Sequence, residues 1–501
     1  MFFFAKEMKG WNIPIEMDAM DPLPSCMFDV FALSLPRGLA FGENPPVSAW
    51  RSYDWITIGA LTRNATTNRH GVLTMRRRVD DVWAVLRWED DAFTEEEAMA
   101  ILRQVCDETA GRIPVPSGTK RRPSLPDFRG KELSGIFKLL AHPSRHRGAW
   151  MLNQLYLAMP NPDDNWASDC RTENFHSRLW EALLLASFRE QGLLVTQDRP
   201  SPDFHVSNRK GGEAWVEAVT ANPAERYDHA NTEEAPIPQD RRELTLGTAA
   251  VRYAKTIKNK LDKGYAHMPH VAGRPFAIAI ADFHAPGSMV WSRAALLGYL
   301  SGIYVRELEQ DGKRVAVPEV VETLLGEQPI PAGLFSTPEG EDLSAVIFSN
   351  AATLAKLSRV PVSFGGPTTD YRYVRIGEFA DFTPGALRGI PFSMDVNSDE
   401  YRALWAPYRY EPWTAEMEVF HNPNAKHPIN PALFPEATHW LPIDGIMDCK
   451  RFYEHSILKS RTWILGADDR IPTVDDLVFQ ETHDSTNHTG DDGTIAEARV
   501  T

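Results

Sequence analysis

The sequence predicts a mixed α/β protein in which helices cover a sheet. Residues 50–90 alternate apolar and polar side chains, as strands with one buried face do. Residues 173–283 follow the order helix, strand, hairpin, helix, strand, which is typical of a sheet with a crossover helix. The runs at 275–281 and 343–349 are apolar enough to be buried on both faces, as central strands are.

Composition and charge are those of a soluble globular protein. The 501 residues suffice for two to four domains, and 43% hydrophobic with 24% charged residues is ordinary. A net charge of −15 offers no broad basic surface for nucleic acid, although a local basic cleft is compatible with it. No apolar span approaches membrane length, and the N-terminal apolar run is too short for a signal peptide. The four cysteines form no CxxC pair, which argues against a zinc ribbon or a disulfide framework. We therefore expect a cytoplasmic protein without a membrane partner.

Residues 1–110 are expected to form an N-terminal α+β module. Strands are predicted at 55–58, 71–75 and 82–87, and Thr94 with Glu97 has the spacing of a capping box that begins a helix. Residues 111–130 are rich in proline and are interpreted as a linker or an extended arm. The run Arg76-Arg77-Arg78 is either a phosphate contact or, as we favour, a solvated strand end paired with Asp80 and Asp81.

The central helix carries an unusual carboxylate. Leu179, Leu183 and Phe188 share an apolar stripe, and Gly192 ends the helix. Glu181 lies among apolar neighbours on this helix, where a carboxylate is costly to bury without a partner. Two explanations stay open: Arg178 pairs with Glu181, or Glu181 helps to hold a metal ion or a substrate group.

A hairpin follows this helix and carries two further acids. Residues 202–206 and 214–220 are predicted to be strands joined by a turn at 208–212. Trp215, Glu217 and Val219 share one strand face, because side chains alternate across a strand. Asp203 and Glu217 then lie on paired strands within reach of one cation, and Mg²⁺ prefers such oxygen ligands.

A basic amphipathic helix is predicted at 247–263, before the buried strand 275–281. Its inward positions are apolar, and basic side chains surround them at Arg252, Lys255, Lys258, Lys260 and Lys263. Strand, helix and buried strand together indicate a right-handed parallel crossover.

The order of these motifs resembles the PD-(D/E)XK, or restriction-endonuclease-like, superfamily. The matching residues are Glu181 in the first helix, Pro202-Asp203, and Glu217, within residues 173–283. The resemblance implies a restriction-endonuclease-like mixed sheet flanked by helices, which we place at 131–375. It also implies Mg²⁺-dependent hydrolysis of DNA, with Mn²⁺ able to replace Mg²⁺. Asp203, Glu217 and Glu181 would be the metal ligands.

One position departs from the superfamily pattern. Val219 stands where the catalytic lysine of the superfamily stands, and valine can neither activate water nor offset charge on a phosphate. Some members supply the lysine from the following helix, so Lys255, Lys258 or Lys260 could act, and we choose Lys260. Alternatively, these lysines form a solvated or DNA-facing side of the helix, or the fold persists without catalysis.

The C-terminal part gives weaker signals. Residues 376–480 are rich in proline and aromatic residues and are expected to be irregular, and residues 481–501 are expected to be a disordered tail. His421 and His427 could bind a metal, but their Asn-Pro and His-Pro surroundings favour turns.

Two functions follow from these expectations. The first is a metal-dependent DNA endonuclease, with a defence or restriction system as its expected setting, in which Glu181, Asp203, Glu217 and Lys260 are catalytic. The second is an inactive nuclease fold that binds nucleic acid or serves as a scaffold. The sequence leaves the DNA form and the oligomeric state open, a dimer included.

Overall fold

The computed structural model describes most of the chain. The described residues are 20–23, 44, 46–107, 111–125, 132–172, 174–208, 210–223, 240–310, 313–363, 370–383, 386, 388–443 and 446–476. They form a mixed α and β structure with several sheets. The chain divides into two compact units, residues 1–122 and residues 123–501. Within the described residues, no helix is long and apolar enough to cross a membrane.

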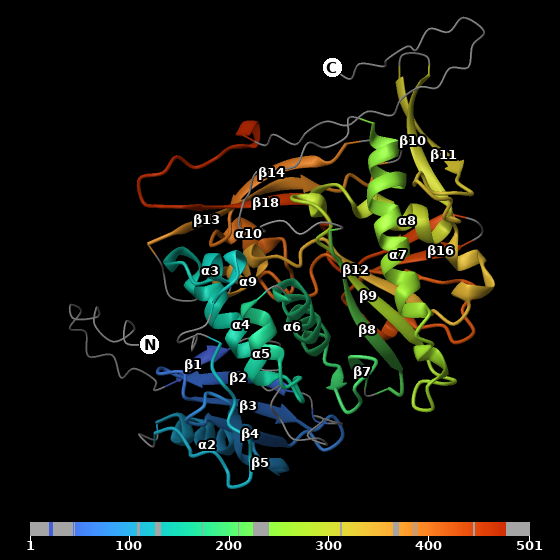
Figure 1. Ribbon diagram of the computed structural model, residues 1–501. Helices are drawn as coiled ribbons and strands as arrows, with labels where there is room; N and C mark the ends of the chain where they lie inside the picture. The colour runs from blue at the N-terminus through green and yellow to red at the C-terminus, as the bar shows by residue number, and fades with distance from the viewer. Residues whose placement is uncertain are drawn as a thin grey trace, which may run out of the picture. The chain divides into compact units, whose positions relative to one another are not determined.

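The first unit contains a five-stranded antiparallel sheet with one helix packed on it (Figure 1). The strands follow each other in chain order: β1 (Met20–Leu23), β2 (Pro46–Ser52), β3 (Thr57–Arg63), β4 (His70–Arg77) and β5 (Trp83–Phe93). Helix α2 (Glu95–Asp107) buries Ala98 and Leu102 against Leu61 and Val72 of the sheet. The capping box is confirmed, because Thr94 N donates to Glu97 Oε2 at 2.8 Å and Glu97 N donates to Thr94 Oγ1 at 3.3 Å.

The arginine run of this unit is buried rather than solvated. Arg78 donates two hydrogen bonds to the carboxylate of Asp80, at 2.9 and 2.6 Å. Arg77 lies over the ring of Trp83 at 4.0 Å and donates to the carbonyl of Asp81 at 2.6 Å. The pairing of Arg78 with Asp80 is therefore confirmed. The expectation that these arginines are solvated was wrong, because all three are buried. Residues 111–122, expected to belong to a linker, pack with this unit, and Ile113 forms a β-bridge with Arg78.

The second unit is built on an eight-stranded mixed sheet. Its strands lie in the order β17-β16-β15-β12-β9-β8-β7-β6. Their bounds are β6 (Leu194–Thr196), β7 (Phe204–Ser207), β8 (Glu213–Ala221), β9 (Phe276–Asp282), β12 (Ala345–Ser349), β15 (Met417–His421), β16 (Thr438–Ile443) and β17 (Ile446–Lys450). The strands β6, β7 and β8 form an antiparallel meander, whereas β8, β9 and β12 are parallel. The predicted hairpin and parallel crossover are thus present.

Helices cover both faces of this sheet. On one face, α7 (Ala250–Leu261) and α8 (Arg293–Ser301) pack on Trp215, Val219 and Ile280 in one apolar core. On the other face, α6 (Phe175–Glu190) reaches the alternate side chains of β8, because Ser177 Oγ lies 3.0 Å from Thr220 Oγ1. Successive side chains of β8 therefore point alternately toward α7 and toward α6. Figure 1 shows α6, α7 and the strands β7, β8, β9 and β12 in this arrangement.

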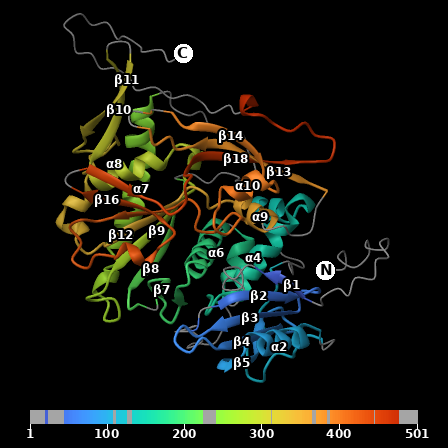
Figure 2. The same cartoon turned by 180° about the vertical axis from the view of Figure 1, so that it is seen from behind.

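The remaining elements surround this core (Figures 1 and 2). Further helices are α3 (Gly135–Leu140), α4 (His146–Ala158), α5 (Trp166–Arg171), α9 (Leu354–Ser363) and α10 (Asp399–Ala403). Further strands are β10 (Ile303–Gln310) and β11 (Lys313–Val320), which form a two-stranded ribbon, and β13 (Arg372–Phe379), β14 (Ile390–Asp395) and β18 (Ile457–Leu465), which form a three-stranded sheet.

The expectation that residues 376–480 are irregular was wrong. Strands β15, β16 and β17 extend the central sheet, and β14 and β18 flank β13 in the smaller one. Proline concealed the pattern, since Pro391 lies in the edge strand β14, where a missing backbone donor is tolerated. The tail expected at 481–501 lies outside the described residues.

Candidate functional site

The hairpin of β7 and β8 brings Asp203 close to Glu217. Phe204, the residue after Asp203, pairs with Val216, the residue before Glu217. Asp203 Oδ2 accepts a hydrogen bond of 2.7 Å from the backbone N–H of Ala218. Antiparallel pairing and this hydrogen bond together hold the two carboxylates at adjacent positions of the sheet.

Glu217 meets the amine of Lys260 across the crossover. Lys260 lies in the last turn of α7, and its Nζ is 2.6 Å from Glu217 Oε1. The side chain of Glu217 is 5% exposed and that of Lys260 is 25% exposed, so the pair opens to solvent on the lysine side. Among the described residues, Glu217 Oε2 is buried and has no hydrogen-bond partner. One oxygen of this buried carboxylate is thus left for another ligand.

The site holds more negative than positive charge. Burial raises the pKa of Asp203 well above its usual value, and the charges of Glu217 and Glu181 raise it further. The Ala218 N–H and the Lys260 amine lower the pKa of Asp203 only in part. Two carboxylates beside one amine form an environment that a cation would stabilise.

Glu181 is engaged within its own helix and with α5. Its carboxylate accepts hydrogen bonds from Arg178 at 3.0 and 3.2 Å and from the indole N–H of Trp166 at 2.8 Å. Arg178 also reaches Asp169, at 2.5 Å. Burial is the main cause that raises the pKa of Glu181, and Arg178 opposes it. The pairing with Arg178 is the explanation that holds, although Glu181 lies near enough for its charge to act on Asp203.

The structure does not assemble the three expected ligands into one metal centre. In the part of the chain that the structure describes, no group of three or more His, Cys, Asp or Glu side chains could hold a metal ion. Asp203 and Glu217 remain the carboxylates brought together, and Glu181 stands apart with Arg178. A metal at this site would take its other ligands from water or phosphate oxygens, as Mg²⁺ commonly does.

The three candidate lysines of the crossover helix differ in position. Lys258 is exposed and pairs with Glu339 at 2.5 Å and Asp262 at 3.2 Å. Lys255 is exposed on the same helix. Lys260 approaches the acids, and Val219 packs into the core beneath α7. The amine beside Glu217 is thus that of Lys260 on the helix, whereas Val219 on the strand is a core side chain.

Tyr265 is a residue that sequence reasoning missed at this site. It follows Gly264, which has a left-handed φ of 65° and ends the segment after α7. Burial, followed by the charge of Glu217, raises the pKa of the Tyr265 phenol. Gly264, three residues after the end of α7, was the available sequence signal, because a glycine there indicates a change of chain direction after the helix.

The histidines predicted as possible ligands do not form a metal site in the described residues. His421 lies in β15, and its Nε2 is 2.8 Å from His439 Nδ1, while His439 Nε2 is 2.9 Å from the carbonyl of Phe434. Burial lowers the pKa of His421 to about 4, and the neighbouring His439 contributes to this shift. The pair is a buried structural contact between adjacent strands.

Comparison of the chain with protein-family models, with curated proteins and with solved structures gave no significant match.

Proposed function

We propose that this protein is a metal-dependent nuclease that hydrolyses phosphodiester bonds of DNA on a restriction-endonuclease-like core. Support comes from the order α6, β6, β7, β8, α7, β9, in which an antiparallel meander is followed by a crossover helix and a parallel strand. Asp203 directly precedes β7 and Glu217 lies in β8, which is the order that the superfamily pattern implies. A restriction or defence setting is part of the proposal.

The observation that carries the proposal is the contact between Lys260 and Glu217. An acid pair with a lysine amine beside it suits phosphodiester hydrolysis, because the amine can offset charge that grows on the phosphate. Here the lysine comes from α7, and its Nζ is 2.6 Å from Glu217 Oε1. The neighbouring surface lysine Lys258 is instead satisfied by Glu339 and Asp262. Lys260 thus faces the acids of the site, whereas Lys258 on the same helix forms surface ion pairs.

The donor set fits a hard divalent cation such as Mg²⁺ or Mn²⁺. Asp203 and Glu217 would hold it through carboxylate oxygens, and the buried Oε2 of Glu217 is without a hydrogen-bond partner in the described residues. When bound, such an ion supplies Lewis acidity and lowers the pKa of bound water. Lys260 would donate hydrogen bonds to a non-bridging phosphate oxygen, where negative charge grows as water attacks phosphorus.

A second candidate function is nucleic-acid binding without catalysis. Val219 in the core favours it, because the lysine position of the strand is lost. Engagement of Glu181 by Arg178 favours it as well, because a possible third ligand is withdrawn. Cleavage and binding must therefore be measured side by side.

The test compares two lysines of one helix. Lys260→Met is expected to reduce Mg²⁺-dependent cleavage of single- or double-stranded DNA by about 100-fold or more, as removal of one transition-state donor does. The matched control Lys258→Met should retain cleavage within about twofold, because surface ion pairs contribute little. Both variants are assayed with Mg²⁺ and with Mn²⁺ and in parallel for DNA binding. Equal cleavage by the two variants would refute the role of Lys260, whereas binding without any cleavage by the wild type would support the second function.

A further inference from the structure

Two buried histidines join neighbouring strands of the central sheet. His421 is the last residue of β15, and His439 lies in β16, which pairs with β15. The Nε2 of His421 is 2.8 Å from the Nδ1 of His439, and the two residues are 7% and 5% exposed. In the part of the chain that the structure describes, no carboxylate acts on either ring. The contact between the strands therefore depends on how many protons the two rings carry.

The positions of these protons follow from the neighbouring groups. The Nε2 of His439 is 2.9 Å from the carbonyl oxygen of Phe434, and a carbonyl only accepts, so this nitrogen carries a proton. The Nδ1 of a neutral His439 then accepts, and the Nε2–H of His421 is its donor. Two neutral rings thus satisfy both hydrogen bonds. If both rings are charged, both facing nitrogens carry a proton and the hydrogen bond between the strands is lost.

The surroundings of the pair disfavour protonation. Burial lowers the pKa of His421 to about 4, and the neighbouring His439 lowers it further, whereas the backbone of Ile429 opposes this shift. Burial also lowers the pKa of His439; the carbonyl of Phe434 opposes that shift, and the charge of Lys450 on β17 adds to it. Both imidazoles are therefore neutral at neutral pH, and the hydrogen bond between them is intact.

The hairpin of β16 and β17 is attached to the sheet over a short length. β16 pairs with β15 only over Thr438–Trp440, whereas β8 and β9 pair from Trp215 to Ala221. The other neighbour of β16 is β17, which is the last strand at this edge of the sheet. Separation of β15 from β16 would therefore release this hairpin and leave the central strands paired.

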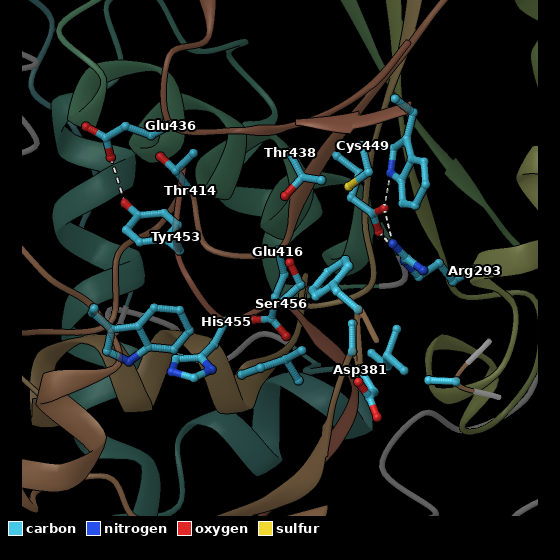
Figure 3. Close-up of a pocket in the computed structure, with 18 of the residues that line it drawn as sticks. Arg293, Asp381, Thr414, Glu416, Glu436, Thr438, Cys449, Tyr453, His455 and Ser456 are labelled. Carbon is cyan, nitrogen blue, oxygen red and sulfur yellow. Dashed lines mark hydrogen bonds and ion pairs between the residues drawn. The ribbon is translucent and has the colours of Figure 1, made fainter. Parts of the chain in front are cut away.

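The same hairpin forms part of the wall of a pocket of about 200 Å³. Thr438 and Trp440 of β16 and Cys449 of β17 line this pocket together with Arg293. Figure 3 shows Thr438, Cys449 and Arg293 among the side chains around it. The indole N–H of Trp440 donates to Glu418 at 2.6 Å, so the histidine pair shares the task of holding the hairpin. Release of the hairpin would remove its side chains from the pocket wall.

We propose that His421 and His439 form an acid-sensitive latch that holds the β16–β17 hairpin on the central sheet. At neutral pH, two uncharged imidazoles join β15 to β16 by a hydrogen bond. When both rings are protonated, two N–H groups and two positive charges face each other at a buried position, and the hairpin separates from β15. The separation opens the pocket. The latch does not depend on the nuclease activity.

Acid weakens this contact in a defined pH range. The folded-state pKa of each histidine lies below its value in the unfolded chain. The stability that the neutral pair provides is therefore complete above a pH of about 6.5 and is lost as the pH falls toward 4. Burial raises the pKa of Glu436, which lies just before β16, so this acid has the opposite pH dependence. Loosening of the hairpin at acidic pH is thus the effect of the histidines.

Hydrogen–deuterium exchange of the full chain at pH 7 and pH 5 tests the proposal. After correction for intrinsic exchange rates, amides of β16 and β17 should exchange about tenfold or more faster at pH 5. The reason is that each pH unit within the range changes the opening equilibrium by up to about tenfold. Amides of β9 and β12 should change by less than about twofold. Unchanged exchange of the hairpin, or equal acceleration of all four strands, would overturn the proposal.

Two variants and one control assign the effect to the pair. His421→Gln keeps an N–H donor toward His439 and does not titrate, so the exchange of the hairpin should be the same at both pH values. His439→Asn keeps an acceptor for His421 and tests the latch from the other strand. His427→Gln is the control, because His427 is an exposed histidine in the segment after β15. Circular dichroism confirms folding. A wild-type pH response in a folded latch variant, or loss of the response in the control, would overturn the assignment.

Discussion

Replacement of Asp203 with asparagine is expected to stabilise the metal-free protein. Asp203 loses water on folding and faces the charges of Glu217 and Glu181, so its ionised form is disfavoured in the folded state. Asparagine removes that charge and can still accept the hydrogen bond from Ala218 through its amide oxygen. Stabilising changes of a single residue commonly amount to about 0.5–2 kcal/mol, and we expect about 1 kcal/mol here.

The pH dependence of this gain has a defined sign. The folded-state pKa of Asp203 is raised above its value in the unfolded chain. The protonated carboxyl therefore stabilises the fold fully at acidic pH, below the unfolded pKa, and this contribution is lost as the pH rises through the folded pKa. The difference in unfolding free energy between Asp203→Asn and the wild type should be small at acidic pH and should grow toward neutral and alkaline pH.

A divalent cation should reverse the order of the two proteins. A ligand at 100 times its Kd adds about 2.7 kcal/mol to the stability of the protein that binds it. With Mg²⁺ the wild type should gain stability, whereas Asp203→Asn should respond weakly because one ligand carboxylate is gone. Thermal unfolding of both proteins in EDTA and in Mg²⁺ measures the effect, with the exposed Asp468→Asn as control. A metal-free Asp203→Asn that is less stable than wild type, with equal Mg²⁺ responses of the two, would refute the reasoning.

Three further predictions concern buried charges. Burial, followed by the charge of Glu436, raises the pKa of Glu190 to about 7. The stability that its protonated form provides is therefore complete at acidic pH and is lost as the pH rises through 7. Glu190→Gln should unfold at a higher denaturant concentration than wild type at pH 8 but not at pH 5. Arg359 donates to both oxygens of the fully buried Glu411, at 2.8 to 3.2 Å, so Arg359→Met should cost about 3–5 kcal/mol in urea unfolding, and a loss below about 1 kcal/mol would contradict a buried pair. Arg178→Met should leave Glu181 buried without its cation and reduce the unfolding free energy by a similar amount, unless Glu181→Gln is introduced with it.

The local elements of the core could be read from the sequence. The predicted helix at 247–263 contains α7, and the predicted strands at 275–281 and 343–349 overlap β9 and β12 by most of their length. Amphipathic periodicity and continuous apolar runs are local signals, so one sequence suffices for them. The end of α8 carries a local signal of the same kind: the helix stops at Ser301, Gly302 follows with a left-handed φ of 69°, and the chain continues as β10.

The site could be predicted in part. The positions of Asp203 and Glu217 followed from strand pairing, which the turn at 208–212 made recognisable. The partners of Glu181 were harder, because Arg178 is a neighbour on its helix but Trp166 comes from α5. The C-terminal strands of the central sheet pair over long sequence distances, and their proline and aromatic content masks the alternation that marks a strand.

The central claim is that Asp203 and Glu217 hold a metal ion for the cleavage of DNA. The most direct measurement is the rate of Mg²⁺-dependent hydrolysis of single- and double-stranded DNA by wild-type protein and by folded Asp203→Asn. The account predicts cleavage by the wild type that EDTA abolishes and that Asp203→Asn lacks. Cleavage by Asp203→Asn at the wild-type rate would contradict it.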